Sequence, residues 1–159
     1  MKKFVCLLNN KIFKHAAIML LLAGSFVSCG NENNDPVETP FTEYSLAGTF
    51  CQWTNLNYDD KIIVINSNEK LASYINCLEG NYPEIDFLKY TLLLANGIVP
   101  NGCIIKKCLL QQLSINGYKL DIEILTDISE IMCPWVMALI VNKLKEESNI
   151  ELKIIVKQL

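Results

Sequence analysis

The chain has 159 residues, of which 51% are hydrophobic and 19% charged, and this length is typical of one folded domain. Its 14 basic residues are all lysine, so the bidentate recognition of phosphate or guanine that arginine performs is not available. Together with a formal net charge of −3, the absence of arginine argues against nucleic acid as a partner.

The first 28 residues have the three-part pattern of an export signal. A lysine-rich start is followed by the mostly apolar run from Ala16 to Val27 and then by Ser28. This order of basic, apolar and small residues is that of a secretion signal. A membrane-spanning helix needs roughly 20 apolar residues and this run is shorter, so we predict a signal peptide over residues 1–28.

The end of this segment, Phe26-Val27-Ser28-Cys29, resembles the lipobox of bacterial lipoproteins, with Phe26 where leucine is usual. The resemblance implies cleavage before Cys29, acylation of its sulfur (palmitate, for example) and anchoring of the chain in a membrane through that lipid. Gly30 replaces the aspartate that retains enteric lipoproteins in the inner membrane, which implies the outer membrane, with the surface as one possible side. The alternative is ordinary cleavage near Ser28, leaving Cys29 a plain cysteine.

Removal of residues 1–28 limits the chemistry that remains. The single histidine, His15, lies in the predicted signal, and the rest of the chain has ten lysines against 17 acidic residues, a net charge of −7. Without histidine, a chain lacks the Ser-His-Asp and Cys-His catalytic sets, histidine zinc sites and histidine proton shuttles. We therefore expect a protein without enzymatic activity and without a cofactor.

The segment that follows Cys29 is polar and acidic. Residues 30–40 contain almost no apolar side chains, so we predict a disordered tether over residues 29–40 and one globular domain over residues 41–159. Such acidic tethers resemble the surface-export signals of Bacteroidetes lipoproteins. A plain spacer is the alternative. The 119 residues after Pro40 are enough to bury a core.

The first elements of the domain are a strand and a helix. Lys61–Ile65 is short, apolar and β-branched, which predicts a strand. Asn66, three residues before Glu69, is typical of a helix start. Apolar residues at helical spacing (Leu71, Ile75 and Leu78) and Gly80 as a terminator then predict one main helix.

The remainder of the chain indicates strands. The first, Tyr90–Ala95, is apolar and ends at Asn96-Gly97, and a second over residues 104–115 has broken alternation that predicts a bulge. Asn116-Gly117 predicts a two-residue hairpin turn, and residues 118–124 alternate as a strand with one wet face.

Two further strands complete the prediction. An apolar run over residues 132–142, a polar turn over 143–149 and an alternating run over 151–157 indicate them. The sum is an α+β fold, mostly antiparallel β-sheet of six or seven strands with one main α-helix.

Five cysteines lie in the predicted domain, and an exported domain can form disulfides. If there is one bridge, we favour Cys51 to Cys77, which would tie the first strand to the end of the helix. The alternative is that some or all five are buried thiols. Cys103 and Cys108 face opposite sides of a regular strand and cannot bridge each other. No Cys-x-x-Cys pair exists, so we expect no metal site.

Two kinds of side chain are candidates for binding. Trp53 and Trp135 could form an aromatic surface for sugar or peptide, with core packing as the alternative. Asp121 and Glu123 share one strand face and could act on glycosidic bonds or bind calcium, with solvated charge as the alternative. We read Asp59-Asp60 as the start of a turn.

A longer stretch resembles known lipoproteins. Residues 65–71, Ile85-Asp86-Phe87, Tyr90–Leu94 and Gly97 resemble a set of Bacteroidetes lipoproteins of unknown function. The same order is similar to the C-terminal domain of protease-complex-stabilising lipoproteins, although the Gly-Gly-Tyr element of that family is absent. The resemblance implies structural roles, with Phe87 in the core and Asp86 capping a turn, and no catalytic residue.

Three functions are compatible with these patterns. The first is a lipid-anchored cell-envelope protein with a non-enzymatic binding or accessory role, whose partner is an unknown protein or glycan. The second, from the resemblance, is a protease inhibitor or protease-complex subunit, which would present an exposed loop or edge strand. The third is a glycan-cleaving enzyme that uses only carboxylates.

Overall fold

The computed structural model describes residues 35–159, so the predicted signal peptide and Cys29 lie outside the described residues. None of the described helices is long and apolar enough to cross a membrane. The elements, in chain order, are β1 (Val37–Glu38), β2 (Thr42–Glu43), β3 (Cys51–Trp53), β4 (Lys61–Ile65), α1 (Asn68–Ala72), β5 (Ile75–Cys77), β6 (Tyr90–Val99), β7 (Cys103–Gln112), β8 (Gly117–Thr126), β9 (Cys133–Asn142) and β10 (Asn149–Gln158).

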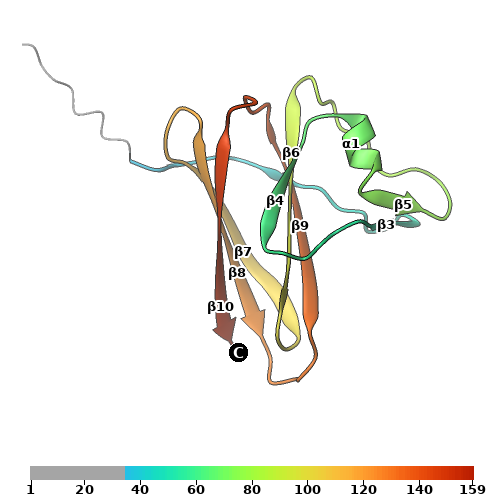
Figure 1. The fold of residues 1–159 in the computed structure, drawn as a ribbon, viewed down its shortest axis with the longest axis vertical. Coiled ribbons are helices and arrows are strands. Elements are labelled where there is room, and N and C mark those ends of the chain that lie inside the picture. Colours follow the sequence, from blue (N-terminus) through green and yellow to red (C-terminus); the bar gives the residue numbers. More distant parts are fainter. Residues whose placement is uncertain (1–34) are drawn as a thin grey trace, which may run out of the picture. The chain divides into compact units, whose positions relative to one another are not determined.

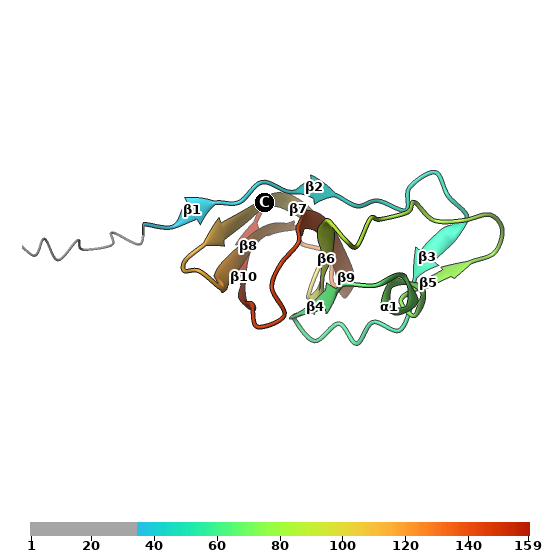
Figure 2. The same ribbon diagram turned by 90° about the horizontal axis from the view of Figure 1, so that it is seen from above.

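The strands form three sheets (Figures 1 and 2). Sheet A has the order β1-β7-β8-β10, and sheet B has the order β2-β9-β6-β4. A two-stranded ribbon, β3-β5, lies beside α1 at one side. All strand pairs are antiparallel except β8 and β10, which run parallel over their full length.

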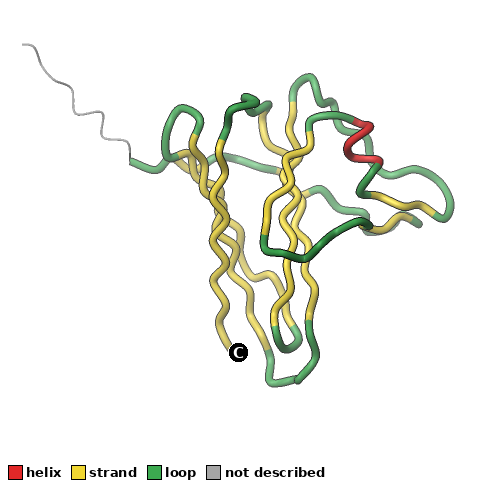
Figure 3. Tube along the Cα trace, in the orientation of Figure 1, coloured by secondary structure: helices red, strands yellow, loops and turns green. Residues whose placement is uncertain are grey.

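The predicted α+β class with one main helix is wrong, because the described chain is mostly β. Its one helix, α1, is a single short turn (Figure 3). Ser67, and not Asn66, caps it by accepting a hydrogen bond from the Lys70 N–H at 3.2 Å. Ile75 then leaves the helical path and pairs with Trp53 of β3. Cross-strand pairing and a disulfide thus override the helical spacing that the sequence displays.

The strand β6 continues past Asn96-Gly97, where the sequence predicted its end. Asn96 is buried, and its side-chain oxygen accepts a hydrogen bond from the Tyr58 N–H at 2.8 Å, so it does not turn the chain. Gly97 lies directly opposite Trp135 of β9. The glycine here provides room for an indole ring, and the strand pairing runs on to Val99.

The hairpin between β7 and β8 also differs from its prediction. Gly117 is the first residue of β8, and the connection is the four-residue loop 113–116. The backbone N–H groups of Leu113 and Ser114 donate to the Gly117 carbonyl at 2.8 and 3.2 Å. Neither Asn116 nor Gly117 has the positive φ that a type I′ turn requires.

Two strand predictions are confirmed. The register of β7 against β8 shifts between Ile105 and Lys107, which is the predicted bulge. In β8 the alternation holds, with Leu120, Ile122 and Ile124 fully buried and the charged residues between them partly exposed.

Two hydrophobic clusters lie on opposite faces of sheet B. The first fills the space between sheets A and B and includes Leu93 of β6 together with Ile122 of β8. The second lies between sheet B and the layer of α1 and the ribbon, and it includes Leu92 and Leu71. Sheet B is therefore the middle layer, and β6 is buried on both faces.

The segment that enters the domain crosses from one sheet to the other. Val37 and Glu38 pair with β7 of sheet A, and Thr42 and Glu43 pair with β9 of sheet B. Ordered structure therefore begins before the domain boundary at residue 41 that composition predicted. Backbone pairing, which composition does not report, fixes this start.

We predict that Gly97→Ala lowers the free energy of unfolding by roughly 1 to 3 kcal/mol. A methyl group at Gly97 would meet the Asp60 carboxylate and would lie 2.6 Å from the buried Trp135 ring. Gly117→Ala is the matched control, because its methyl would meet only the rotatable Ser114 hydroxyl closely. Urea denaturation of both variants checks this, and an equal effect of the two would contradict it.

Candidate functional site

Two disulfides cross-link the described part of the chain. Cys51 and Cys77, directly opposite each other in the β3-β5 ribbon, form the pair that the sequence favoured. A second disulfide, Cys103 to Cys133, was not predicted from the sequence. It joins the first residue of β7 in sheet A to the first residue of β9 in sheet B. It therefore fixes the two sheets to each other at one end of the sandwich.

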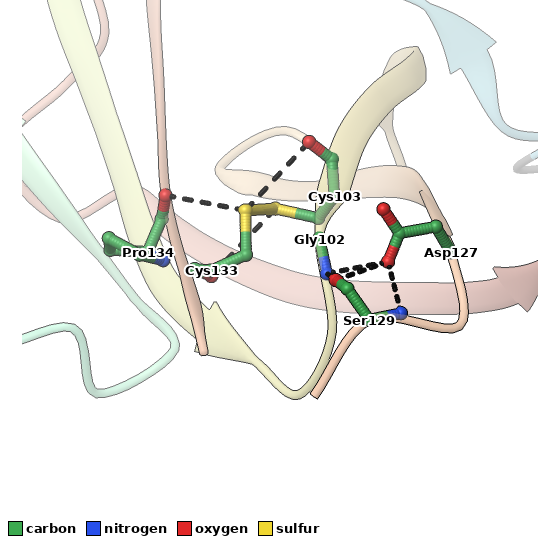
Figure 4. Close-up of a disulfide and its surroundings, with 6 residues drawn as sticks. All are labelled: Gly102, Cys103, Asp127, Ser129, Cys133 and Pro134. Carbon is green, nitrogen blue, oxygen red and sulfur yellow. Dashed lines mark hydrogen bonds between the residues drawn. A yellow bond between two sulfur atoms is a disulfide. The ribbon is translucent and has the colours of Figure 1, made fainter. Parts of the chain in front are cut away.

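The loops around this second disulfide are held by a compact network of hydrogen bonds (Figure 4). One carboxylate oxygen of Asp127 accepts from the Gly102 N–H at 2.9 Å, the Ser129 N–H at 2.8 Å and the Ser129 hydroxyl at 2.6 Å. The Asp127 N–H in turn donates to the Gly102 carbonyl at 3.0 Å. Hydrogen bonds from Ser129, and then from Gly102, hold the pKa of Asp127 below its usual value.

Exposed aliphatic side chains lie on the loop between β8 and β9. We use the term apolar loop end for its residues Ile128, Ile131 and Met132, which are 85%, 69% and 57% exposed. Ile98 of β6 and Ile104 of β7 are also exposed, but they lie on opposite outer faces of the two sheets, because their neighbours Val99, Cys103 and Ile105 pack between the sheets. Large apolar side chains that lie together and remain exposed are typical of interaction surfaces.

The charged residues of the loop that carries the apolar loop end are acidic. The loop from Asp127 to Met132 carries two carboxylates, Asp127 and Glu130, and no lysine. The aliphatic residues of this loop were not identified as a candidate site from the sequence, because they follow neither helical nor strand periodicity. The signal that was present is three large apolar residues within a short loop that also carries serine and acidic residues.

The two tryptophans do not form the predicted aromatic surface. Trp135 is 4% exposed and belongs to the cluster between sheets A and B. Trp53 packs against the other cluster, with its ring centroid 5.9 Å from that of Tyr44. Sheet B separates the two indoles, so core packing, the alternative reading, describes them.

The acidic pairs are matched with lysines. Asp121 is paired with Lys119 at 3.1 Å, and Glu123 is paired with Lys157 at 2.9 Å. Asp59 is paired with Lys61 at 2.6 Å. Within residues 35–159, no group of three or more cysteine, histidine or acidic residues is placed to hold a metal ion.

A shallow groove beside residues 84–86 is one of several concave features of the described chain. It measures about 360 Å³ and combines apolar Phe41 and Tyr90 with Glu84 and Asp86. Asp86, however, accepts from the Leu88 N–H at 3.1 Å and pairs with Lys89 at 2.8 Å, and this lysine lowers its pKa. A general acid needs a raised pKa, which is the opposite shift. The hydrogen bond from the Leu88 N–H shows that Asp86 caps a turn, as the resemblance implied.

The remaining described cysteine, Cys108, is the only unpaired one among residues 35–159. Burial, and then the nearby charge of Glu43, raise the pKa of its thiol to about 11. A thiol with a raised pKa is a poor nucleophile at neutral pH. Cys108 therefore behaves as a packing residue of the sandwich.

Comparison with known proteins gives no indication of function, so any functional proposal rests on the sequence and the structure. A scan against protein-family models and searches of curated proteins and of solved structures found no match to this chain.

We predict that the double variant Cys103→Ser/Cys133→Ser loses about 3 to 4 kcal/mol of stability, because the disulfide closes a loop with a sequence separation of 30. The Gly102 and Ser129 amides should also exchange faster with solvent, since the network they belong to loses its anchor. Cys51→Ser/Cys77→Ser is the control, with a similar separation of 26.

Denaturant unfolding and hydrogen exchange followed by NMR measure the two effects. The control variant should lose comparable stability. Exchange of its Gly102 and Ser129 amides through local opening, as distinct from global unfolding, should stay unchanged. Equal loosening of these amides in both double variants would contradict a local role for the Cys103–Cys133 bridge.

Proposed function

We propose that this protein is an exported, lipid-anchored cell-envelope protein that binds another protein through its apolar loop end and has no enzymatic activity of its own. The observation that carries the proposal is the set of three exposed aliphatic side chains, Ile128, Ile131 and Met132, on the loop that leads into the Cys103–Cys133 disulfide. Rigid loops lose little conformational entropy on binding, which favours affinity.

The chemistry of the apolar loop end favours a protein partner. Aliphatic side chains with a polar rim match the usual anatomy of a protein interface. Glycan sites rely on aromatic faces, and the residues of the apolar loop end include none. Asp127 and Glu130 would be repelled by an anionic lipid surface. A partner with an apolar recess and a neutral or basic rim fits these features best.

Export and anchoring rest on the amino-terminal sequence, which lies outside the described residues. The basic, apolar and small order of residues 1–28 and the lipobox-like end at Cys29 support them. The two disulfides of the folded domain fit an oxidising compartment outside the cytoplasm.

The two other functions receive less support. A protease inhibitor or protease-complex subunit would use an exposed loop, and the loop from Asp127 to Met132 meets that one requirement. A carboxylate-only glycan hydrolase needs a general acid, and of the two carboxylates in the groove Asp86 is held in its ionised form by Lys89.

We predict that Ile131→Asp weakens partner binding at least about tenfold, because it removes an apolar contact and places a charge in the interface. Stability should change by less than about 0.5 kcal/mol, since Ile131 is mostly exposed. Site-specific photo-crosslinking from residue 131 in the native host identifies the partner, and titration of that purified partner measures the change.

Ile115→Asp is the matched control. Ile115 is 78% exposed but lies in the β7–β8 loop, at the other end of the strands. A photo-crosslinker at residue 115 should give no specific adduct. The proposal fails if residues 115 and 131 give the same adducts, or if the two aspartate variants weaken binding equally.

We predict that Cys29→Ser abolishes acylation and releases the protein from the membrane fraction. Without the sulfur there is no site for the lipid, and one or more acyl chains provide the anchoring free energy. Intact mass of the detergent-extracted protein should show a chain that begins at Cys29 and carries acyl groups. A native protein that retains residues 1–28 and lacks lipid would refute the anchoring proposal.

A further inference from the structure

The outer edge of β10 is not hydrogen-bonded to another strand of the described chain, although β10 contacts β4 of sheet B. The Asn149 N–H donates to the Asn116 carbonyl of the neighbouring chain segment at 2.8 Å, and the Leu159 N–H donates to the Thr126 carbonyl at 2.9 Å. Backbone groups alternate in direction along a strand. The backbone N–H and C=O groups of the odd-numbered residues of β10 therefore point toward β8. Those of the even-numbered residues point away from β8 and have no backbone partner in the described chain.

The other long edges are protected, and this one is not. The β7 edge is covered at one end by β1 and is interrupted by the bulge at Ile105 and Lys107. The β9 edge is covered by β2 and Tyr44 at residues 138–140 and contains Pro134 near its start. Bulges, proline and short covering strands block edge-to-edge pairing. The strand β10 has none of these features and pairs regularly over ten residues.

The charges on β10 match those of a second, antiparallel copy of the same strand. The side chains on the face that points away from sheet B are Glu151, Lys153, Ile155 and Lys157. If two copies pair antiparallel with Ile154 opposite Ile154, Glu151 of each copy lies opposite Lys157 of the other. The smallest shift that keeps the same side-chain faces together moves one strand by two residues. In one direction it places Lys153 opposite Lys153, and in the other it places Lys153 opposite Lys157. Like charges directly opposite each other are unfavourable.

The same register aligns the apolar face. The side chains of Ile150, Leu152 and Ile154 already pack against the cluster between sheets A and B. Antiparallel pairing about Ile154 sets Leu152 against Val156 of the second copy, and Val156 is 50% exposed in the single chain. Every outward N–H and C=O of the even-numbered residues gains a partner, and the apolar row continues from one copy into the next.

We propose that β10 is a dimerisation edge, through which two copies of this chain join antiparallel about Ile154 to form one continuous sheet with the order β1-β7-β8-β10-β10-β8-β7-β1. This surface is separate from the residues of the apolar loop end. The proposal therefore does not depend on the proposed function, and a dimer carries two copies of the apolar loop end.

The backbone test is Val156→Pro in the full chain, with Val156→Ala as its control. Proline at residue 156 removes an outward N–H that β8 does not use, and edge strands tolerate proline at such positions. In sedimentation velocity over a wide concentration range, the unmodified chain and Val156→Ala should form dimers. Val156→Pro should raise the dimer Kd at least about tenfold, with circular dichroism showing that its fold is intact.

The charge test distinguishes the register. Glu151→Lys and Lys157→Glu should each weaken self-association, because each places like charges opposite each other twice in a symmetric dimer. Mixing the two variants should restore association, since both charge pairs become attractive in the mixed dimer. Lys157 also pairs with Glu123 in its own chain, so the thermal stability of Lys157→Glu is measured alongside.

The outcomes are decisive in each arm. A chain that stays monomeric at all concentrations overturns the proposal, as does a dimer that Val156→Pro leaves unchanged. A dimer that depends on residue 156 but shows no recovery when the charge variants are mixed overturns the register about Ile154.

Discussion

The rest of the fold depends on the burial of β6 on both of its faces. Leu93 and Ala95 point into the cluster between the two large sheets, while Leu92 and Leu94 point into the cluster beneath α1 and the ribbon. A strand covered on both sides must be apolar throughout, and its polar residues must find partners. Thr91 and Asn96 do so, through hydrogen bonds to Asn66 at 2.6 Å and from Tyr58 at 2.8 Å. Both clusters are stable only while this strand stays in place.

The peripheral elements are small and are held by covalent links. The ribbon has three residues per strand, and the Cys51–Cys77 bridge closes it beside α1. Such short elements bury little surface of their own, so a disulfide that restricts the unfolded chain contributes much of their order. The Cys103–Cys133 bridge lies where the loop between β8 and β9 projects aliphatic side chains into solvent. The bond that joins the two sheets therefore also restrains the apolar loop end, which is the surface proposed for binding.

The two surfaces proposed for binding follow from different physics. The apolar loop end exposes hydrophobic side chains, so its association with a partner would be driven mainly by the release of water. The β10 edge exposes backbone hydrogen-bonding groups with charged residues beside them, so its association would depend on register and on salt. In the proposed dimer, the opposite charges of Glu151 and Lys157 would favour pairing of this edge with a reversed copy of itself. The edges of β7 and β9, in contrast, are interrupted by a bulge and by Pro134.

The sequence by itself determined the alternation of β8 and the bulge in β7, because each depends on the local spacing of apolar residues. It favoured the Cys51–Cys77 pair, although on the expectation that Cys77 ends a helix, whereas Cys77 lies in β5. The capping role of Asp86 followed from the resemblance to known lipoproteins. The sequence also defined the export signal and Cys29, which remain predictions. The tertiary structure alone decided that Ile75 enters a strand, that Asn96-Gly97 continues one and that Trp135 is buried, since each depends on a partner strand distant in sequence. The same reason applies to the pairing of Cys103 with Cys133 and to the open edge of β10. No local pattern states which strand lies beside which, and at those positions the contact with the neighbouring strand outweighs the intrinsic preference of the residues.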